Sequence, residues 1–417
     1  MVFTFLGDEK PKVIDEYVAD MEKPGFVGKK KNIVISFDGT GGQPEWGLNK
    51  EPVPLHSNAG GLSNICKLHL HAGGNIGNSK RVYEDQIACY YSGVGTRGSS
   101  NLYKLLVQST PAYSSGLSMD HIANEAAEDI KQIYRDGDKV FVFGFSRGAA
   151  TARLFVSHIN KNYDMKIAFL GVFDTVLESL KYGLGTSIAN MDYGDRKDSS
   201  LPECVEKAVH FVAIDEERYN FRPVLFNEDK NVKEIWVPGV HSDAGGGYYH
   251  DGISDAVLKC MLMEAEKAGL RWREITKEIV EEQRDTIVCP ETNFDTQVLS
   301  IFDKDLDLSP DALDLDVHSQ LFWLFNIINW MFSFKHRTIG KVRNDEFVPN
   351  EPILLLDIAV QRVKELELEE GLSVPSYVSK KYRPENLKGI PYKLVNSKDM
   401  SISEKVYDGI ELEVDEW

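Results

Sequence analysis

Short apolar runs alternate with segments of helical periodicity through the first two thirds of the chain. Five runs have the length and composition of buried strands: 32–37, 86–91, 140–143, 167–173 and 234–237. Segments of helical spacing lie between them, at 119–135, 148–159 and near 202–209. Continuous apolar strands that alternate with helices are typical of a mostly parallel sheet covered on both faces. The pattern therefore predicts an α/β fold, in which ligands bind at the carboxyl ends of the strands.

The helix at 119–135 carries its own start and stop signals. Asp120 is of a residue type that caps helix N-termini, and Gly137 follows the last apolar position, where glycine commonly ends a helix. We therefore expect this helix to begin at Asp120 and to end before Gly137.

The alternation of strands and helices fades after about residue 275. We accordingly predict three parts: an N-terminal arm at 1–30, a catalytic core at 31–275 and an α-rich C-terminal accessory region at 276–417. The last part contains a further helical pattern near 358–370. No internal repeat is present.

An aromatic-rich run at 321–334 follows an acidic stretch at 303–316. Its three polar residues fall on one helical stripe, and three basic residues follow at 335–337. Such a helix can cover an acyl pocket as a lid, contact a membrane interface, or lie in the core, and these readings stay open. Segment 318–337 is thus a candidate lid or membrane contact, with the candidate substrate contacts Trp323, Phe325, Trp330 and Phe334.

The net charge excludes one class of partner and limits another. The formal charge is −18 at pH 7 and the pI is about 5.1. Binding to nucleic acid needs clustered Lys and Arg, so we expect no nucleic-acid partner. An anionic membrane would not be held by charge either, and apolar contact would have to hold any lipid.

The cysteines and the first residues indicate where the chain folds. Five cysteines are scattered, with no CxxC pair and no histidine at zinc spacing, which is typical of reduced thiols in the cytoplasm. The first residues lack the pattern of a signal peptide, and no stretch reaches the roughly 20 apolar residues that span a bilayer. We expect synthesis in the cytoplasm without a signal peptide, with export by another route left open.

The candidate nucleophile is Ser146, in the sequence GFSRG at 144–148. The pattern G-x-S-x-G is weak alone, but here an apolar strand runs directly into it and a helix opens directly after it. This strand–turn–helix context is that of a nucleophile elbow, in which a tight turn lifts the serine hydroxyl clear of the sheet. An ordinary turn between strand and helix is the alternative.

A serine nucleophile needs a base and an acid that orients the base. Asp174 follows the strand at 167–173 and His241 follows the strand at 234–237, in the order that this fold requires. Asp243 is too close in sequence to His241 to orient its ring, and Asp215 lies in a charged cluster that suits a structural ion pair. We therefore predict the triad Ser146, Asp174 and His241.

The oxyanion of the reaction needs two backbone N–H donors. One is expected from Arg147, the residue after the nucleophile. The other is expected from the glycine-rich loop after the first strand, at Gly39 or Thr40, because glycine allows the backbone to approach a substrate closely. A plain turn is the alternative for that loop.

Three other motifs fail on their chemistry. Residues 93–98 read GVGTRG, yet the helix and acidic residue of a dinucleotide site do not follow. Residues 36–40 are similar to the D-x-D-G-T of haloacid-dehalogenase phosphatases, but Ser36 stands where the nucleophilic carboxylate belongs. Residues 303–307 imitate an EF-hand loop, but Leu308 occupies the position that needs glycine. We therefore predict no cofactor and no metal.

Six segments in this order resemble a known family: FDGTGG, YYSGVGT, GFSRGAATAR, GVFDTV, GVHSDAGGGY and YRPEN. They resemble the α/β-hydrolase domain of type VI secretion phospholipase effectors, the first lipase-effector group, once described as a domain of unknown function. The resemblance runs from about Asn32 to Leu387 and implies a catalytic Ser146, Asp174 and His241. It also implies a phospholipid ester as substrate.

The sequence thus predicts an α/β-hydrolase that cleaves carboxylic esters of phospholipids, of phospholipase A type. The resemblance implies an antibacterial effector exported by a type VI secretion system to a target membrane, with a secretion-system component or an immunity protein as partner. Two alternatives stay open: a general carboxylesterase on a soluble ester, and a non-catalytic binding protein on a hydrolase fold.

Overall fold

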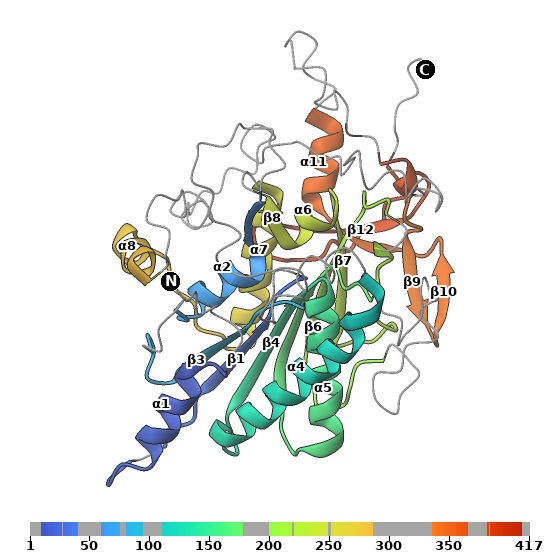
Figure 1. The fold of residues 1–417 in the computed structure, drawn as a ribbon. Coiled ribbons are helices and arrows are strands. Elements are labelled where there is room, and N and C mark those ends of the chain that lie inside the picture. Colours follow the sequence, from blue (N-terminus) through green and yellow to red (C-terminus); the bar gives the residue numbers. More distant parts are fainter. Residues whose placement is uncertain are drawn as a thin grey trace.

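The computed structural model describes residues 10–26, 28–40, 60–75, 81–94, 111–177, 200–218, 221–248, 252–286, 336–365, 382 and 384–410. An eight-stranded sheet lies at the centre, in the order β12-β11-β7-β6-β5-β4-β1-β3, and every pairing in it is parallel (Figure 1). Its strands are β1 (Asn32–Phe37), β3 (Gln86–Tyr91), β4 (Lys139–Phe145), β5 (Ile167–Phe173), β6 (Ala208–Ala213), β7 (Val232–Val237), β11 (Ile353–Leu356) and β12 (Tyr392–Val395). The prediction of a mostly parallel α/β-hydrolase-type sheet flanked by helices is confirmed.

The two faces of the sheet are covered by different helices. Side chains alternate along a strand, so Ile33 and Ile35 of β1 enter one hydrophobic cluster and Val34 enters another. The first cluster lies under α1 (Lys12–Met21), α4 (Pro111–Ile133) and α5 (Arg147–Asn162). The second lies under α2 (Asn64–His71) and α7 (Gly252–Lys267). Because both faces are covered, every residue of the central strands β5 and β6 is buried.

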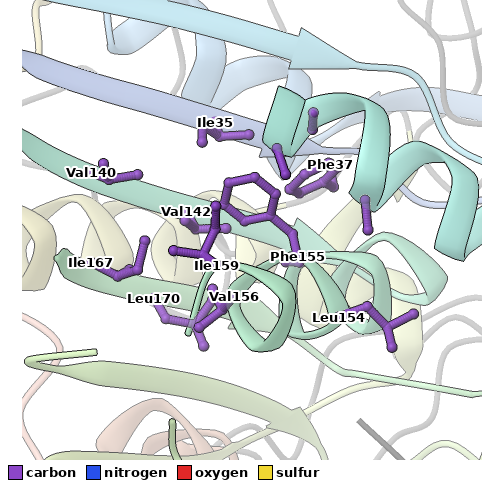
Figure 2. Packing of buried hydrophobic residues seen from close by; sticks show 14 of the residues in the cluster. Ile35, Phe37, Val140, Val142, Leu154, Phe155, Val156, Ile159, Ile167 and Leu170 are labelled. Atoms are coloured by element: carbon purple, nitrogen blue, oxygen red, sulfur yellow. The ribbon is translucent and has the colours of Figure 1, made fainter. Parts of the chain in front are cut away.

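Helix α5 is the element that fixes the candidate nucleophile on the sheet. Its residues Phe155, Val156 and Ile159 are fully buried against β1, β4 and β5 (Figure 2). The ring of Phe155 lies 5.6 Å from the ring of Phe37 at the end of β1. Full burial of one such side chain contributes about 1.5–3 kcal/mol, so this face of α5 holds the start of the helix firmly against the strand ends.

The remaining described elements surround the sheet. The shorter elements are β2 (Gly60–Ser63), α6 (His241–Gly245), β8 (Gly246–Tyr248), α8 (Lys277–Thr286), β9 (Gly340–Arg343), β10 (Glu346–Pro349), α11 (Asp357–Glu365) and the 3-10 helix η5 (Glu385–Leu387). Strands β2 and β8 pair antiparallel, as do β9 and β10. No helix among the described residues is long and apolar enough to cross a membrane.

Two local predictions are wrong. The helix expected near 202–209 is absent: turns lead into β6, because the run at 208–213 is buried at all six positions and serves as a central strand. The prediction that Asp120 caps a helix also fails, because α4 begins at Pro111 and Asp120 lies within it. The spacing of apolar residues predicted the helix from residue 119 onward but not its first turns at 111–118.

The C-terminal part of the chain differs from the α-rich accessory region expected after residue 275. Strands β11 and β12 extend the main sheet beyond β7, so the sheet continues through this part. Short apolar runs such as residues 353–356 do not distinguish strand from helix by periodicity alone. In the predicted N-terminal arm, α1 packs Ile14 and Tyr17 into the core.

Candidate active site

Ser146 occupies the turn between β4 and α5 with an unusual backbone conformation. Its φ is 58° and its ψ is −128°, a region that residues other than glycine rarely adopt. Its N–H donates to the carbonyl of Phe173 at 3.1 Å, which ties the turn to the end of β5. The side chain is buried. These are the backbone features of a nucleophile elbow.

The glycines of GFSRG are required by close backbone contacts. A Cβ on Gly144 would lie 2.5 Å from the carbonyl oxygen of Gly148. A Cβ on Gly148 would lie 2.2 Å from the carbonyl oxygen of Asp38. Both distances are impossible for a real carbon atom, so the motif packs β4, α5 and the end of β1 together at this point.

Asp174 and His241 meet beside this turn. Asp174 directly follows β5, and His241 is the first residue of α6. The Nδ1 atom of His241 lies 2.5 Å from Oδ2 of Asp174, and both side chains are buried. The imidazole packs against the rings of Phe145 and Phe221, at 4.6 and 4.8 Å between centroids. Since Phe145 immediately precedes Ser146, the imidazole lies next to the turn that carries the candidate nucleophile.

The charge states of the pair suit a general base. Burial lowers the pKa of His241, and the hydrogen bond to Asp174 offsets only part of that effect. Burial by itself raises the pKa of Asp174, but the charge of Arg337 and the hydrogen bond to His241 outweigh it and hold the pKa of this carboxyl well below its usual range. At neutral pH Asp174 is therefore an anion, and the ring of His241 is neutral, as a base must be before it accepts a proton.

Arg337 is a member of this cluster that sequence reasoning missed. Its Nη1 donates to Oδ1 of Asp174 at 2.6 Å, and its Nη2 donates to Oδ2 at 2.9 Å. The same guanidinium donates to the carbonyls of Ala213, at 2.8 Å, and Phe221. The only sequence signal was a basic residue after the aromatic run, and nothing in the pattern connects it to an acid 163 residues away.

Other polar groups hold the loops that carry Asp174 and His241. Nε2 of His210 accepts the N–H of Thr175 at 3.1 Å, and Nδ1 of His210 lies 2.9 Å from Glu234, so this second buried histidine fixes the turn after Asp174. Glu216 accepts the N–H of His241 at 3.2 Å. His210 thus has a structural partner on each ring nitrogen.

The two acids that the sequence analysis set aside have structural partners. Oδ2 of Asp243 accepts the N–H of Val240 at 2.7 Å, at the start of α6. Oδ2 of Asp215 accepts the N–H of Gly239 at 2.6 Å and the hydroxyl of Tyr382 at 2.8 Å. Both carboxylates therefore shape the loop that presents His241.

The loop after β1 lies against Ser146, but its two candidate donors differ. A Cβ on Gly39 would be 3.5 Å from Cβ of Ser146, so this backbone passes close to the candidate nucleophile. The N–H of Gly39 already donates to Oδ1 of Asp38 at 2.7 Å. Thr40 makes no such bond with another described residue, and its buried hydroxyl has no partner there either. Arg147 is the first residue of α5, where a backbone N–H has no acceptor within the helix.

Asp38 itself is a buried anchor for this loop. Its Oδ2 accepts the hydroxyls of Ser63, at 2.8 Å, and Tyr90, at 2.5 Å. Burial raises the pKa of Asp38, and these hydrogen bonds oppose the rise. The carboxylate thus joins the end of β1 to β2 and β3. The predicted substrate contacts Trp323, Phe325, Trp330 and Phe334 lie outside the described residues.

Five chains of solved structures are similar to this chain at a significant level. An uncharacterized protein from Pseudomonas aeruginosa is 19% identical over 67% of this chain and 53% of its own, with a TM-score of 0.39. The Tle1 effector bound to the VgrG spike of a type VI secretion system is 19% identical over 75% of this chain and 85% of its own, with a TM-score of 0.38. This chain spans about half the length of the Pseudomonas protein. No curated protein matches the chain.

A family model gives a more specific result. Residues 31–162 and 157–264 match the model of the catalytic domain of Tle1-like phospholipase effectors of the type VI secretion system. The two matches together cover more than half of the 417 residues, and they include β1, the turn at Ser146, Asp174 and His241. This chain belongs to the Tle1-like family of type VI secretion phospholipase effectors.

Proposed function

We propose that this protein is a serine hydrolase that cleaves carboxylic ester bonds of phospholipids, with Ser146 as nucleophile. Nε2 of His241 takes the proton of the Ser146 hydroxyl as Oγ forms a bond to the ester carbonyl carbon. The tetrahedral intermediate then collapses, and His241 gives its proton to the departing alcohol oxygen. Water, deprotonated by His241, hydrolyses the acyl-enzyme and releases the fatty acid.

One observation carries the proposal: the strained turn of Ser146 stands beside a buried Asp174–His241 pair whose oxygen and nitrogen are 2.5 Å apart. With Nδ1 of His241 bonded to Asp174, Nε2 is the ring nitrogen that can accept a proton. In the same proposal the N–H groups of Arg147 and Thr40 bind the oxyanion, because the N–H of Gly39 is engaged by Asp38.

The choice of a phospholipid rests on the family. Its members are phospholipase effectors, whereas the arrangement of Ser146, Asp174 and His241 would serve any carboxylic ester. We propose a reaction of phospholipase A type, which yields a lysophospholipid and a free fatty acid. Apolar contact would hold the lipid, since the net charge of −18 does not favour an anionic membrane surface.

A fluorophosphonate probe tests the serine directly. The wild-type protein should be labelled and the Ser146→Ala variant should not, since the probe reacts with an activated serine hydroxyl. Unlabelled wild type would leave the alternative of a binding protein on a hydrolase fold.

Vesicles separate a phospholipase from a general esterase. Mixed phospholipid vesicles treated with wild type should release fatty acid and lysophospholipid, measured by mass spectrometry, and vesicles treated with Ser146→Ala should not. Hydrolysis of short soluble esters without any hydrolysis of vesicles would instead support the general carboxylesterase.

The biological setting proposed here is export by a type VI secretion system into a competing bacterium. The family consists of phospholipase effectors of that system. A secretion-system component and an immunity protein are the partners that this role requires. Co-culture of a producing strain with a susceptible strain should show killing that depends on both the secretion system and Ser146.

A further inference from the structure

The carboxylate of Asp174 is shared between two nitrogen-containing side chains. Arg337 donates to both of its oxygens, and His241 contacts Oδ2. Oδ1 also accepts the N–H of Ala213 at 3.0 Å. All three side chains are buried, so water screens their charges weakly. The formal charge of this buried cluster is zero when Arg337 is a cation, Asp174 an anion and His241 neutral.

Arg337 is itself fixed by the C-terminal part of the chain. The side-chain amide of Asn386 donates to the carbonyl of Arg337 at 3.3 Å and to that of Ile214 at 2.8 Å. Tyr382, four residues earlier, bonds to Asp215, which holds Gly239 in the loop before His241. Tyr382 and Asn386 therefore contact the residues that support Asp174 and His241.

We propose that Arg337 is a positioning residue that sets the protonation state of His241 through Asp174. The proposal rests on the assignment of His241 as the catalytic base. The guanidinium holds both carboxylate oxygens in the geometry of a bidentate pair, which fixes the direction in which Oδ2 faces the imidazole. Its charge also balances that of Asp174, so the buried cluster is neutral while the imidazole is unprotonated and able to act as base.

The sign of the effect follows from this balance. Without the Arg337 charge, the cluster of Asp174 and His241 becomes neutral only when His241 is protonated, so the pKa of His241 must rise. Among the described residues, Glu216 and Arg218, which follow β6, are the other charged groups that act on His241. They bond to each other at 2.8 Å, so they largely cancel and do not replace Arg337.

The experiment is an NMR titration of the His241 ring in protein labelled with carbon-13 histidine, with the signal assigned by His241→Asn. We expect the titration midpoint of His241 in Arg337→Gln to lie above that of wild type by on the order of one pH unit. The acid limb of the kcat/KM profile on a short soluble ester should move upward by the same amount. In addition, kcat should fall roughly tenfold to hundredfold, because Asp174 loses two donors that orient it.

Two further variants separate charge from geometry and from folding. Arg337→Lys keeps the charge but cannot make the bidentate fork, so its titration midpoint should stay near that of wild type while kcat falls. Arg343→Gln is the matched control, because Arg343 makes a bidentate pair with Glu351 and donates twice to Oε2 of Glu228 at the surface, with no hydrogen bond to Asp174 or His241. In Arg343→Gln the titration midpoint of His241 and kcat should both equal those of wild type.

The outcomes are distinct. Equal His241 midpoints in folded wild type and Arg337→Gln would overturn the proposal, even if Arg337→Gln lost stability or activity. A shifted midpoint together with an inactive wild type would instead uphold the coupling and refute the hydrolase function, because the NMR titration needs no turnover. If Arg337→Gln does not fold, Arg337→Lys provides the test, because it retains the positive charge. A shift of the His241 titration midpoint by about one pH unit in Arg337→Lys would then contradict the role that we assign to that charge.

Discussion

The replacement Asp174→Asn tests the site at its centre. The amide has nearly the shape of the carboxylate but no charge, and one of its two polar atoms is a donor. It faces the guanidinium of Arg337, which donates to both carboxylate oxygens in the wild type, at 2.6 and 2.9 Å. One of these bonds must therefore be lost, and the ring of His241 loses the anion that stabilises its protonated form.

Both activity and stability should respond to this change. Removal of the acid of such a triad lowers kcat by about 10⁴-fold. Removal of one partner of a buried ion pair costs about 3–5 kcal/mol, because the remaining charge is left uncompensated. The cost here should lie toward the lower end, since Arg337 keeps the carbonyls of Ala213 and Phe221 as acceptors.

The assays are ester hydrolysis and urea denaturation of the same preparations. A variant Asp174→Asn with kcat close to wild type would mean that another acid serves His241. An unchanged free energy of unfolding would mean that Arg337 and Asp174 are not the buried pair described above. The double variant with Arg337→Gln is informative as well: its loss of stability should be smaller than the sum of the two single losses, because the two residues share one interaction.

Two further predictions concern the surroundings of the triad. Gly148→Ala should destabilise the protein by about 1–3 kcal/mol in urea denaturation, because its Cβ would lie 2.2 Å from the carbonyl of Asp38. Gly28→Ala is its control: the nearest atom to that Cβ is 3.4 Å away, so a change of under about 1 kcal/mol is expected, and equal losses in both variants would contradict the packing argument. Burial raises the pKa of Asp215 from 3.8 to about 6, so the folded state binds its proton more tightly than the unfolded state does. The contribution of Asp215 to the free energy of unfolding is therefore fully present below pH 3.8 and is lost as the pH rises toward 6. In Asp215→Asn the free energy of unfolding should change less with pH between these two values. An unaltered pH dependence in this variant would refute the assignment.

The parts of the site that the sequence predicted are those carried by strand ends. Asp174 and His241 could be chosen because each follows a buried apolar run, and parallel strands bring such positions to one edge of the sheet. The strand at 208–213 was missed, because the residues before it imitate helical spacing and its own burial depends on neighbours on both sides. Strand β11 was missed because its short apolar run does not distinguish strand from helix by periodicity alone, and β12 was missed because it lies at the edge of the sheet with only its two end residues buried.

The parts that could not be predicted depend on contacts between distant segments. Arg337 reaches Asp174 across 163 residues, and no local pattern marks such a pairing. Gly39 is a different case. The loop that carries it lies beside Ser146, but the N–H of Gly39 donates to the carboxylate of the preceding residue, Asp38. Side-chain hydrogen bonds of this kind are decided by rotamers and packing, which the order of residues does not reveal.

The separation between Arg337 and Asp174 has a consequence during synthesis. At about 5–20 residues per second, the ribosome needs roughly 8–30 s to add the 163 residues between them. His241 is added 67 residues after Asp174, so over the last part of that interval the nascent protein contains Ser146, Asp174 and His241, yet the cation that neutralises Asp174 has not been made. Asp174 therefore acquires its cationic partner late, and the candidate catalytic cluster is completed only after Arg337 has been made. Newly made protein thus passes through a period in which the candidate nucleophile Ser146 is present without the Arg337–Asp174 ion pair.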